Sequence, residues 1–308
     1  MIKIARSCVS AAVLAALLHA APAQAQTAPI RVFVALTGSD SNPCTFASPC
    51  KSAQHAHDVV AAGGEMRMLD PGSYGLLTIT KAISILGDGH GGIAASNGAT
   101  AITINAGATD KINLRGLVIE GFGTGGNGII FNTGASLDIQ DSFVRNFTIN
   151  GIQFTPSAAS DLKASQTLVS DLAGQGSAVL ISPSGTATVN AVLDDVELDH
   201  GFIGLFVQGS DAGANLNVTV SDSIISNCFS NGIEAHTNGG NATIDVRDST
   251  VATNGNVGVY GAVNAVRLTR SQISGNRAGW AWNVFSYGDN EIEDNTNVNT
   301  APSGIPHK

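Results

Sequence analysis

Positive charge is scarce in this chain. The 308 residues include 15 Lys or Arg against 24 Asp or Glu, and the formal net charge is −9. A nucleic-acid backbone is bound by a basic face, so we expect no nucleic-acid partner. Polysaccharides rich in uronate also need cationic partners, and the shortage of such residues argues against a lyase that acts on them.

Long apolar runs are missing beyond the first residues. Val9–Ala21 is mostly Ala, Leu and Val, follows Lys3 and Arg6, and precedes Ala23-Gln24-Ala25. This order is typical of a signal peptide, which we expect at residues 1–25 with cleavage near Ala25. The alternative is a membrane anchor, but the run is too short for a bilayer core of about 30 Å. We therefore predict a secreted, periplasmic or cell-surface protein with no transmembrane segment in the mature chain.

Cysteine is rare, with four residues in all. Cys8 lies in the predicted signal peptide, and Cys44 and Cys50 lie close together in the loop NPCTFASPC. In an exported protein this spacing predicts a local disulfide. The alternative, a metal site, lacks further Cys or His at ligand spacing. Cys228 is then unpaired, and we interpret it as a buried thiol at a corner of the fold.

Glycine is abundant, with 36 residues, and it accompanies short alternating runs. The segment Val218–Ala235 reads VTVSDSIISNCFSNGIEA, and near-copies fill Leu137–Phe154, Ile244–Gly261 and Val266–Asn283. Repeats built from such runs and Asn/Gly turns predict a β-solenoid. Its repeated strand starts 22 to 28 residues apart, at Gly128, Gly151, Ala178, Gly204, Gly232, Gly258 and Trp280.

Each repeat also offers residues for stacked corners, because Asn and Asp tolerate left-handed backbone and can hydrogen-bond their own backbone. Equivalent corner residues of successive coils should lie above one another and bond along the stack. We expect one such column to contain Asn146, Asp171, His200, Asn227, Asn254 and Asn276.

The ends of the chain differ from the repeats. Residues 26–64 predict a short strand, the disulfide loop and a capping helix over Ser52–Ala62, with Ser52 as the N-cap. His55 and His57 lie two residues apart on different faces of that helix, which does not favour a metal site. We expect the parallel β-helix to span residues 65–296 and a flexible tail to span residues 297–308.

The entry segment carries a family resemblance. A helix and a strand lead into Asp70-Pro71-Gly72-x-Tyr74 and then Ile83-x-Ile85-x-Gly87. The chain resembles the right-handed parallel β-helix proteins of the pectate-lyase-like superfamily. This resemblance implies an all-β, three-sheet solenoid that binds polysaccharide along an outer face. The superfamily includes pectate lyases, polygalacturonases, epimerases, tailspikes and adhesins, so it specifies the fold more than the activity.

One outer face carries an unusual set of side chains. Its strand presents Ile130, Gln153, Leu180, Phe206, Glu234, Tyr260 and Trp282 outward, with Gln208 and His236 in the next outward position. Aromatic rings stack on sugar faces, so Phe206, Gln208, Tyr260 and Trp282 are candidate ligand-binding residues. Glu234 and His236 are the candidate acid/base pair. The alternative is a strip covered by a loop, the tail or a partner chain.

The catalytic motifs of the superfamily are not matched. The Arg-x-Pro-x-x-Arg of pectate lyases is missing, and the polygalacturonase-like Gly89-His90-Gly91 and Asp194-Asp195 occur in the wrong order. A corner column of Asp195, Asp222 and Asp248 before Arg270 is a weak candidate for Ca²⁺, although a turn also demands Asp there. No other cofactor is expected.

Three functions remain open. The first is binding of a polysaccharide, an envelope glycan or another cell-envelope component along one solenoid face. The others are an unrecognised polysaccharide lyase or glycoside hydrolase, and a structural subunit of a surface assembly.

Overall fold

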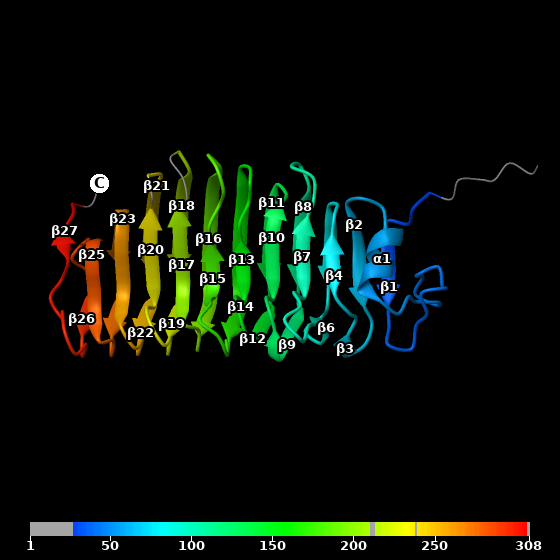
Figure 1. Cartoon of the computed structure of the whole chain (residues 1–308), viewed down its shortest axis with the longest axis horizontal. Coiled ribbons are helices and arrows are strands. Elements are labelled where there is room, and N and C mark those ends of the chain that lie inside the picture. The colour runs from blue at the N-terminus through cyan, green and yellow to red at the C-terminus, as the bar shows by residue number, and fades with distance from the viewer. Residues whose placement is uncertain (1–26, 210–212, 238, 307–308) are drawn as a thin grey trace, which may run out of the picture.

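Successive coils of the chain stack along one axis, as Figure 1 shows. The computed structural model describes residues 27–209, 213–237 and 239–306, so the predicted signal peptide at residues 1–25 lies outside the described part. Every strand pairing within that part is parallel, because each strand pairs with the equivalent strands of the neighbouring coils. The predicted right-handed parallel β-helix with three sheets is confirmed.

The first sheet takes one strand from each coil. Its strands are β4 (Leu77–Ile79), β7 (Ile102–Asn105), β10 (Ile129–Thr133), β13 (Ile152–Phe154), β15 (Ser177–Ile181), β17 (Ile203–Gly209), β20 (Ile233–Thr237) and the first parts of β23 (Val257–Thr269) and β25 (Ala278–Ser286).

The second sheet follows the first in each coil. Its strands are β1 (Arg31–Val34), β2 (Gly64–Met68), β5 (Ile83–Leu86), β8 (Lys111–Arg115), β11 (Ser136–Gln140), the first parts of β14 (Ser160–Ser170) and β16 (Thr188–Asp199), β18 (Asn215–Ser221), β21 (Asn241–Arg247), the ends of β23 and β25, and β27 (Ser303–Gly304).

The third sheet completes the coil. Its strands are β3 (Gly72–Ser73), β6 (Gly91–Ala94), β9 (Val118–Gly125), β12 (Phe143–Phe147), the second parts of β14 and β16, β19 (Ile224–Ser226), β22 (Thr250–Ala252), β24 (Gln272–Ser274) and β26 (Glu291–Glu293).

The recurring Asp-Ser pair makes the corner between the second and third sheets. Asp222 and Asp248 adopt left-handed backbone, with φ of 50° at each. The serine after each Asp turns inward. Ser223 Oγ donates to Ser221 O (2.6 Å) and accepts from Val196 N (3.1 Å) of the preceding coil. The repeated serine is therefore explained by buried hydrogen bonds.

The corner between the third and first sheets differs from the prediction at two positions. Asn227 has the expected left-handed backbone, but in the next two coils Thr253 and Gly275 take that conformation. Asn254 and Asn276 lie one residue later, and both are buried. The reason is that these two amides form an interior hydrogen-bonded column, which offsets the preference of Asn for the left-handed position.

Cys228 begins that interior column. Its backbone N–H donates to Asn254 Oδ1 at 3.0 Å, and its side chain is 2% exposed. Burial raises the pKa of the thiol to about 12, so the sulfur stays protonated at neutral pH. The predicted buried corner thiol is confirmed.

The capping helix α1 (Ala53–Val59) covers the N-terminal end of the first sheet (Figure 1). Ser52 Oγ caps it by accepting from His55 N. His57 is buried, and its Nε2 accepts from Thr80 N at 3.2 Å, just beyond β4. The histidine thus satisfies a backbone group that has no earlier strand of this sheet beside it in the described residues. No helix in the described part of the chain is long and apolar enough to cross a membrane.

The Asp70-Pro71-Gly72-x-Tyr74 segment ties the first coil to the loop after β1. The Tyr74 hydroxyl is hydrogen-bonded to the Asp70 carboxylate, which also accepts from Leu36 N at 3.0 Å. Burial, followed by the hydrogen bond to Asp70, raises the pKa of Tyr74, so the phenol remains a donor. The motif therefore stabilises the fold by joining the first coil to the loop after β1.

Residues 300–304 contact the solenoid, within the segment where the sequence predicts a flexible tail. Ser303 and Gly304 form β27 and pair with Phe285 and Ser286 of β25. Trp280 Nε1 donates to Thr300 O at 2.8 Å. The sequence does not indicate this contact, because the tail lacks the alternating pattern of the repeats.

The carboxylate of Glu120 accepts hydrogen bonds at a coil corner, and its effect on the stability of the fold should depend on pH. Burial alone would raise its pKa, but hydrogen bonds from Phe122 N, Asn146 and Arg145 lower it below the ordinary 4.5. A carboxylate with a lowered pKa stabilises the fold above its unfolded pKa, and the effect is lost as pH falls through the folded pKa. We expect Glu120→Gln to cost about 1 kcal/mol at pH 7, with the difference shrinking below about pH 4.5. Urea unfolding of both proteins across pH 3–7 measures this, and a constant difference would contradict it.

Candidate ring column on the first sheet

Four aromatic rings form a continuous column on the outer face of the first sheet. They belong to Phe206, His236, Tyr260 and Trp282, which we call the ring column. The ring centroids of successive members lie 5.8, 5.3 and 6.3 Å apart. The members come from β17, β20, β23 and β25, so four successive coils contribute one ring each. The column is therefore a stepped aromatic surface along the solenoid axis.

Strand register explains how the first three rings meet. Phe206 pairs with Glu234, and Glu234 pairs with Tyr260, so these three side chains stand in one outward column. His236 stands in the adjacent column with Gln208 and Ala262. The imidazole packs against both neighbouring rings. Its plane is nearly perpendicular to the ring of Phe206 and tilted by 38° from the ring of Tyr260. The predicted residues are thus brought together by simple pairing of parallel strands.

Trp282 reaches the column by a different route from the one predicted. Tyr260 pairs with Ala281, and Trp282 pairs with Gly261, so the sequence register is wrong by one residue. The residue equivalent to Gly258 is Gly279, one residue before Trp280, because the corner after Asn276 is one residue shorter than the corner after Asn254. Trp282 adopts left-handed backbone, with φ of 69°, and its side chain is 68% exposed. The indole still lies beside Tyr260.

Glu234 and His236 form a hydrogen-bonded pair within the column. His236 Nε2 lies 2.7 Å from Glu234 Oε1, and Asn231 Nδ2 donates to Glu234 Oε2 at 2.6 Å. The carboxylate accepts from the imidazole N–H, which leaves Nδ1 as the acceptor of the neutral ring. Within the described residues, no hydrogen bond to that Nδ1 is found. The pair can therefore orient the ring and accept a hydrogen bond or a proton from a ligand.

A related arrangement lies three coils earlier. Gln153 stands in the same outward column as Glu234, and Asn150 Nδ2 donates to its Oε1 at 3.1 Å. Both coils therefore share a hydrogen bond from an asparagine to the outward side chain three residues later. The coil of Glu234 differs because the imidazole of His236 also contacts that outward side chain.

Comparisons with known proteins address the fold. No protein-family model matches the chain, and no curated protein matches it in sequence. Among solved structures, pectate lyase Pel9A is similar, with a TM-score of 0.52 and 12% identity over 89% of this chain and 81% of that one. The chain has the pectate-lyase-like parallel β-helix fold. The A-module of mannuronan C-5 epimerase AlgE4 from Azotobacter vinelandii matches with a TM-score of 0.38 and 12% identity, over 80% of this chain and 91% of that one.

The candidate calcium column is exposed and partly neutralised. Asp195, Asp222 and Asp248 occupy equivalent left-handed corner positions, as predicted. Arg270 forms two hydrogen bonds to Asp248, at 2.7 and 2.6 Å. The guanidinium holds the pKa of Asp248 below its ordinary value. In the described ranges, these three carboxylates are not gathered within ligand distance of one another. The arrangement therefore offers Ca²⁺ no formed cage among these residues.

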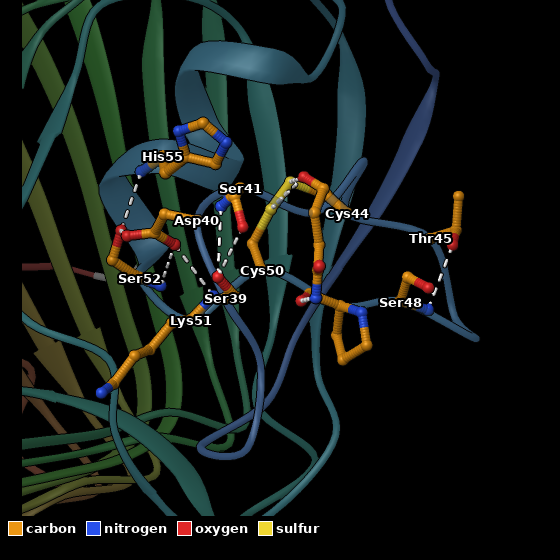
Figure 2. Close-up of a disulfide and its surroundings, with 12 residues drawn as sticks. Ser39, Asp40, Ser41, Cys44, Thr45, Ser48, Cys50, Lys51, Ser52 and His55 are labelled. Atoms are coloured by element: carbon orange, nitrogen blue, oxygen red, sulfur yellow. Dashed lines mark hydrogen bonds between the residues drawn. A yellow bond between two sulfur atoms is a disulfide. The ribbon is translucent and has the colours of Figure 1, made fainter.

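The predicted disulfide between Cys44 and Cys50 is present, as Figure 2 shows. A third side chain, His55, lies near it. Its ring nitrogen and the two sulfurs lie within 4.8 Å of one another. Sequence reasoning rejected a metal site because it found no third ligand. The signal was the spacing Cys-x₅-Cys-x₄-His, which places His55 in the first turn of α1.

Two further rings lie at the corner that precedes β17 and β20. Phe202 and Phe229 stack with centroids 5.6 Å apart, and Phe229 is 79% exposed. They line a hollow of about 470 Å³ together with His200, Asn227 and Gln175. Sequence reasoning missed this pair because it lies in turns of unequal length outside the aligned strands.

Proposed function

We propose that this protein is exported and binds a polysaccharide along the ring column. The observation that carries the proposal is the placement of one ring on each of four successive coils. Adjacent coils are about 4.8 Å apart, so a glycan lying along the axis would meet a new ring at each step. Aromatic faces pack against the apolar faces of sugars. Gln208, Glu234 and His236 supply hydrogen-bonding groups beside the rings.

The fold supports the substrate class. A solved structure with the same fold is a pectate lyase, and β-helices offer long flat faces that suit extended chains. The disulfide supports export, since such bonds persist in oxidising compartments. The excess of acidic residues favours a neutral glycan, or an anionic one bound with added cations.

Truncation of the exposed indole tests the binding proposal. We expect wild-type protein to bind one class among neutral and uronic-acid polysaccharides in calorimetric titration, with and without Ca²⁺. Trp282→Ala should weaken binding about fivefold or more, because it removes a stacking surface worth about 1 kcal/mol. Phe143→Ala is the matched control, because Phe143 is an exposed ring of the third sheet.

Equal losses in Trp282→Ala and Phe143→Ala would contradict the position of the site. Lack of binding to every glycan, together with self-association that Trp282→Ala abolishes, would favour a structural subunit instead.

The hydrogen bond between Glu234 and His236 favours a second candidate function, cleavage of the bound polysaccharide. His236, oriented by Glu234, would act as the proton acceptor for a lyase or hydrolase. Glu234→Gln should retain the fold, because Gln153 already occupies the same position in another coil. If the protein cleaves glycans, we expect this variant and His236→Ala to lose about 100-fold or more in turnover. Unsaturated-product absorbance and reducing ends measure it. Binding without turnover in the wild type would rule out this second function.

A further inference from the structure

Three side chains suited to a soft metal meet at the N-terminal cap. The sulfurs of Cys44 and Cys50 and a ring nitrogen of His55 lie within 4.8 Å of one another. Figure 2 shows the loop and the helix that bring them together. Both cysteines are buried, and His55 is half-buried. Thiolate and imidazole are the ligands that Zn²⁺ takes in tetrahedral protein sites.

The backbone holds the two cysteines together independently of their covalent bond. Cys44 O accepts from Phe33 N at 2.9 Å, and Cys50 N donates to Phe33 O at 3.0 Å. Cys50 O also accepts from Ala35 N at 2.9 Å. Both cysteines are therefore tied to β1 and to the residue that follows it. Their Cα atoms, 4.6 Å apart, should remain close when the sulfurs are reduced.

A separate clamp places His55. The Asp40 carboxylate accepts from Lys51 N and Ser52 N, both at 2.9 Å, and from Ser52 Oγ at 2.8 Å. Ser52 Oγ in turn accepts from His55 N at 3.2 Å. Asp40 belongs to the same loop as Cys44, so the clamp fixes the loop to the first turn of α1. The three ligands are held by contacts that do not involve the sulfur atoms.

We propose that the reduced chain binds one Zn²⁺ through Cys44, Cys50 and His55, with solvent as the fourth ligand, and that disulfide formation closes this site. A phosphine and water reduce the pair: the S–S bond breaks, the phosphine becomes its oxide, and two thiols form. Zn²⁺ then displaces the two thiol protons to solvent. Exchange with a small-molecule disulfide reverses this: the S–S bond re-forms, the small disulfide takes up two protons and leaves as two thiols, and Zn²⁺ loses both thiolates.

Cobalt substitution tests the proposal with a readout independent of glycan binding. The full chain is kept reduced with a phosphine and titrated with Co²⁺. We expect one equivalent to bind with thiolate-to-cobalt charge-transfer absorption, which added Zn²⁺ abolishes. His55→Asn should weaken binding about tenfold or more. The matched control is His90→Asn, an exposed histidine in the corner after β5, which should bind like the wild type.

Three metal-binding results would overturn the proposal. They are a reduced protein without the charge-transfer band, a His55→Asn variant that binds as tightly as His90→Asn, and an oxidised protein that binds Co²⁺ with the same band. Circular dichroism of the reduced, metal-free protein checks the premise that the backbone holds the ligands. Loss of its strand signal would also overturn the proposal.

Discussion

Replacing Asn276 with alanine should lower the free energy of unfolding by about 4 kcal/mol, since buried groups left without partners cost about 1–3 kcal/mol each. Asn276 is 1% exposed. Its Oδ1 accepts from Asn254 N and Nδ2 at 3.0 and 2.9 Å. Its Nδ2 donates to Val251 O and Asn295 Oδ1, both at 3.0 Å. Alanine removes all of these bonds, leaves the buried Asn254 N–H without its partner, and takes one hydrogen bond each from Asn254 Nδ2, Val251 O and Asn295 Oδ1.

Asn217→Ala is the matched control for this prediction. Asn217 is also part of an asparagine ladder, with Nδ2 donating to Asn190 Oδ1 at 3.0 Å, but the ladder is on the exposed face of the second sheet. Water replaces the lost bond there, so we expect a change below about 1 kcal/mol. Urea unfolding followed by circular dichroism compares the two variants. If both lose the same stability, burial of the Asn276 column is not what stabilises these coils.

Gly232→Ala should cost about 2–3 kcal/mol, the upper part of the range of about 1–3 kcal/mol that is usual for adding a methyl group to a filled interior. A Cβ at this position would lie 2.6 Å from Val251 Cγ1, 2.7 Å from Asn254 Nδ2 and 2.8 Å from Gly258 O. Two of these neighbours are packed side chains and the third is the backbone of the next coil. The coils would have to separate, and β20 with Glu234 would move outward.

Gly304→Ala controls for the change of residue type, because nothing lies within 4 Å of a Cβ there. Its free energy of unfolding should lie within about 0.5 kcal/mol of the wild-type value. The thermal midpoint and the urea midpoint of both variants give the comparison. If the Gly232→Ala protein is as stable as the Gly304→Ala protein, the coils around Gly232 accept a methyl group without loss of stability, which contradicts the prediction.

The alternating strands were predictable from sequence because their physics is local. In Val218-Thr219-Val220 the two valines are buried, and the register with β21 matches the alignment of the repeats. The left-handed Asp222 and the buried Ser223 follow from turn chemistry that any coil must satisfy. The disulfide and the helix N-cap were likewise within reach of residue spacing.

The remaining details depend on contacts between coils. Trp282 was misplaced by one residue because the length of a corner sets the register of the strand after it. Asn254 and Asn276 were assigned to the outer turn, since a preference for left-handed backbone is visible in sequence but an interior amide column is not. His55 was missed because its distance from the two sulfurs depends on how the loop folds back onto α1. The hydrogen bond between Glu234 and His236 was foreseen only as a shared outward direction.

The interior asparagine column has a consequence for how such a chain can change over evolutionary time. The backbone N–H to Oδ1 bond is 3.0 Å from Cys228 to Asn254, from Asn254 to Asn276 and from Asn276 to Asn295. Those steps along the chain span 26, 22 and 19 residues. Insertions and deletions at the outer corners therefore leave the interior contacts intact. Loops beside the ring column can therefore differ in length from coil to coil while this interior contact keeps the same geometry.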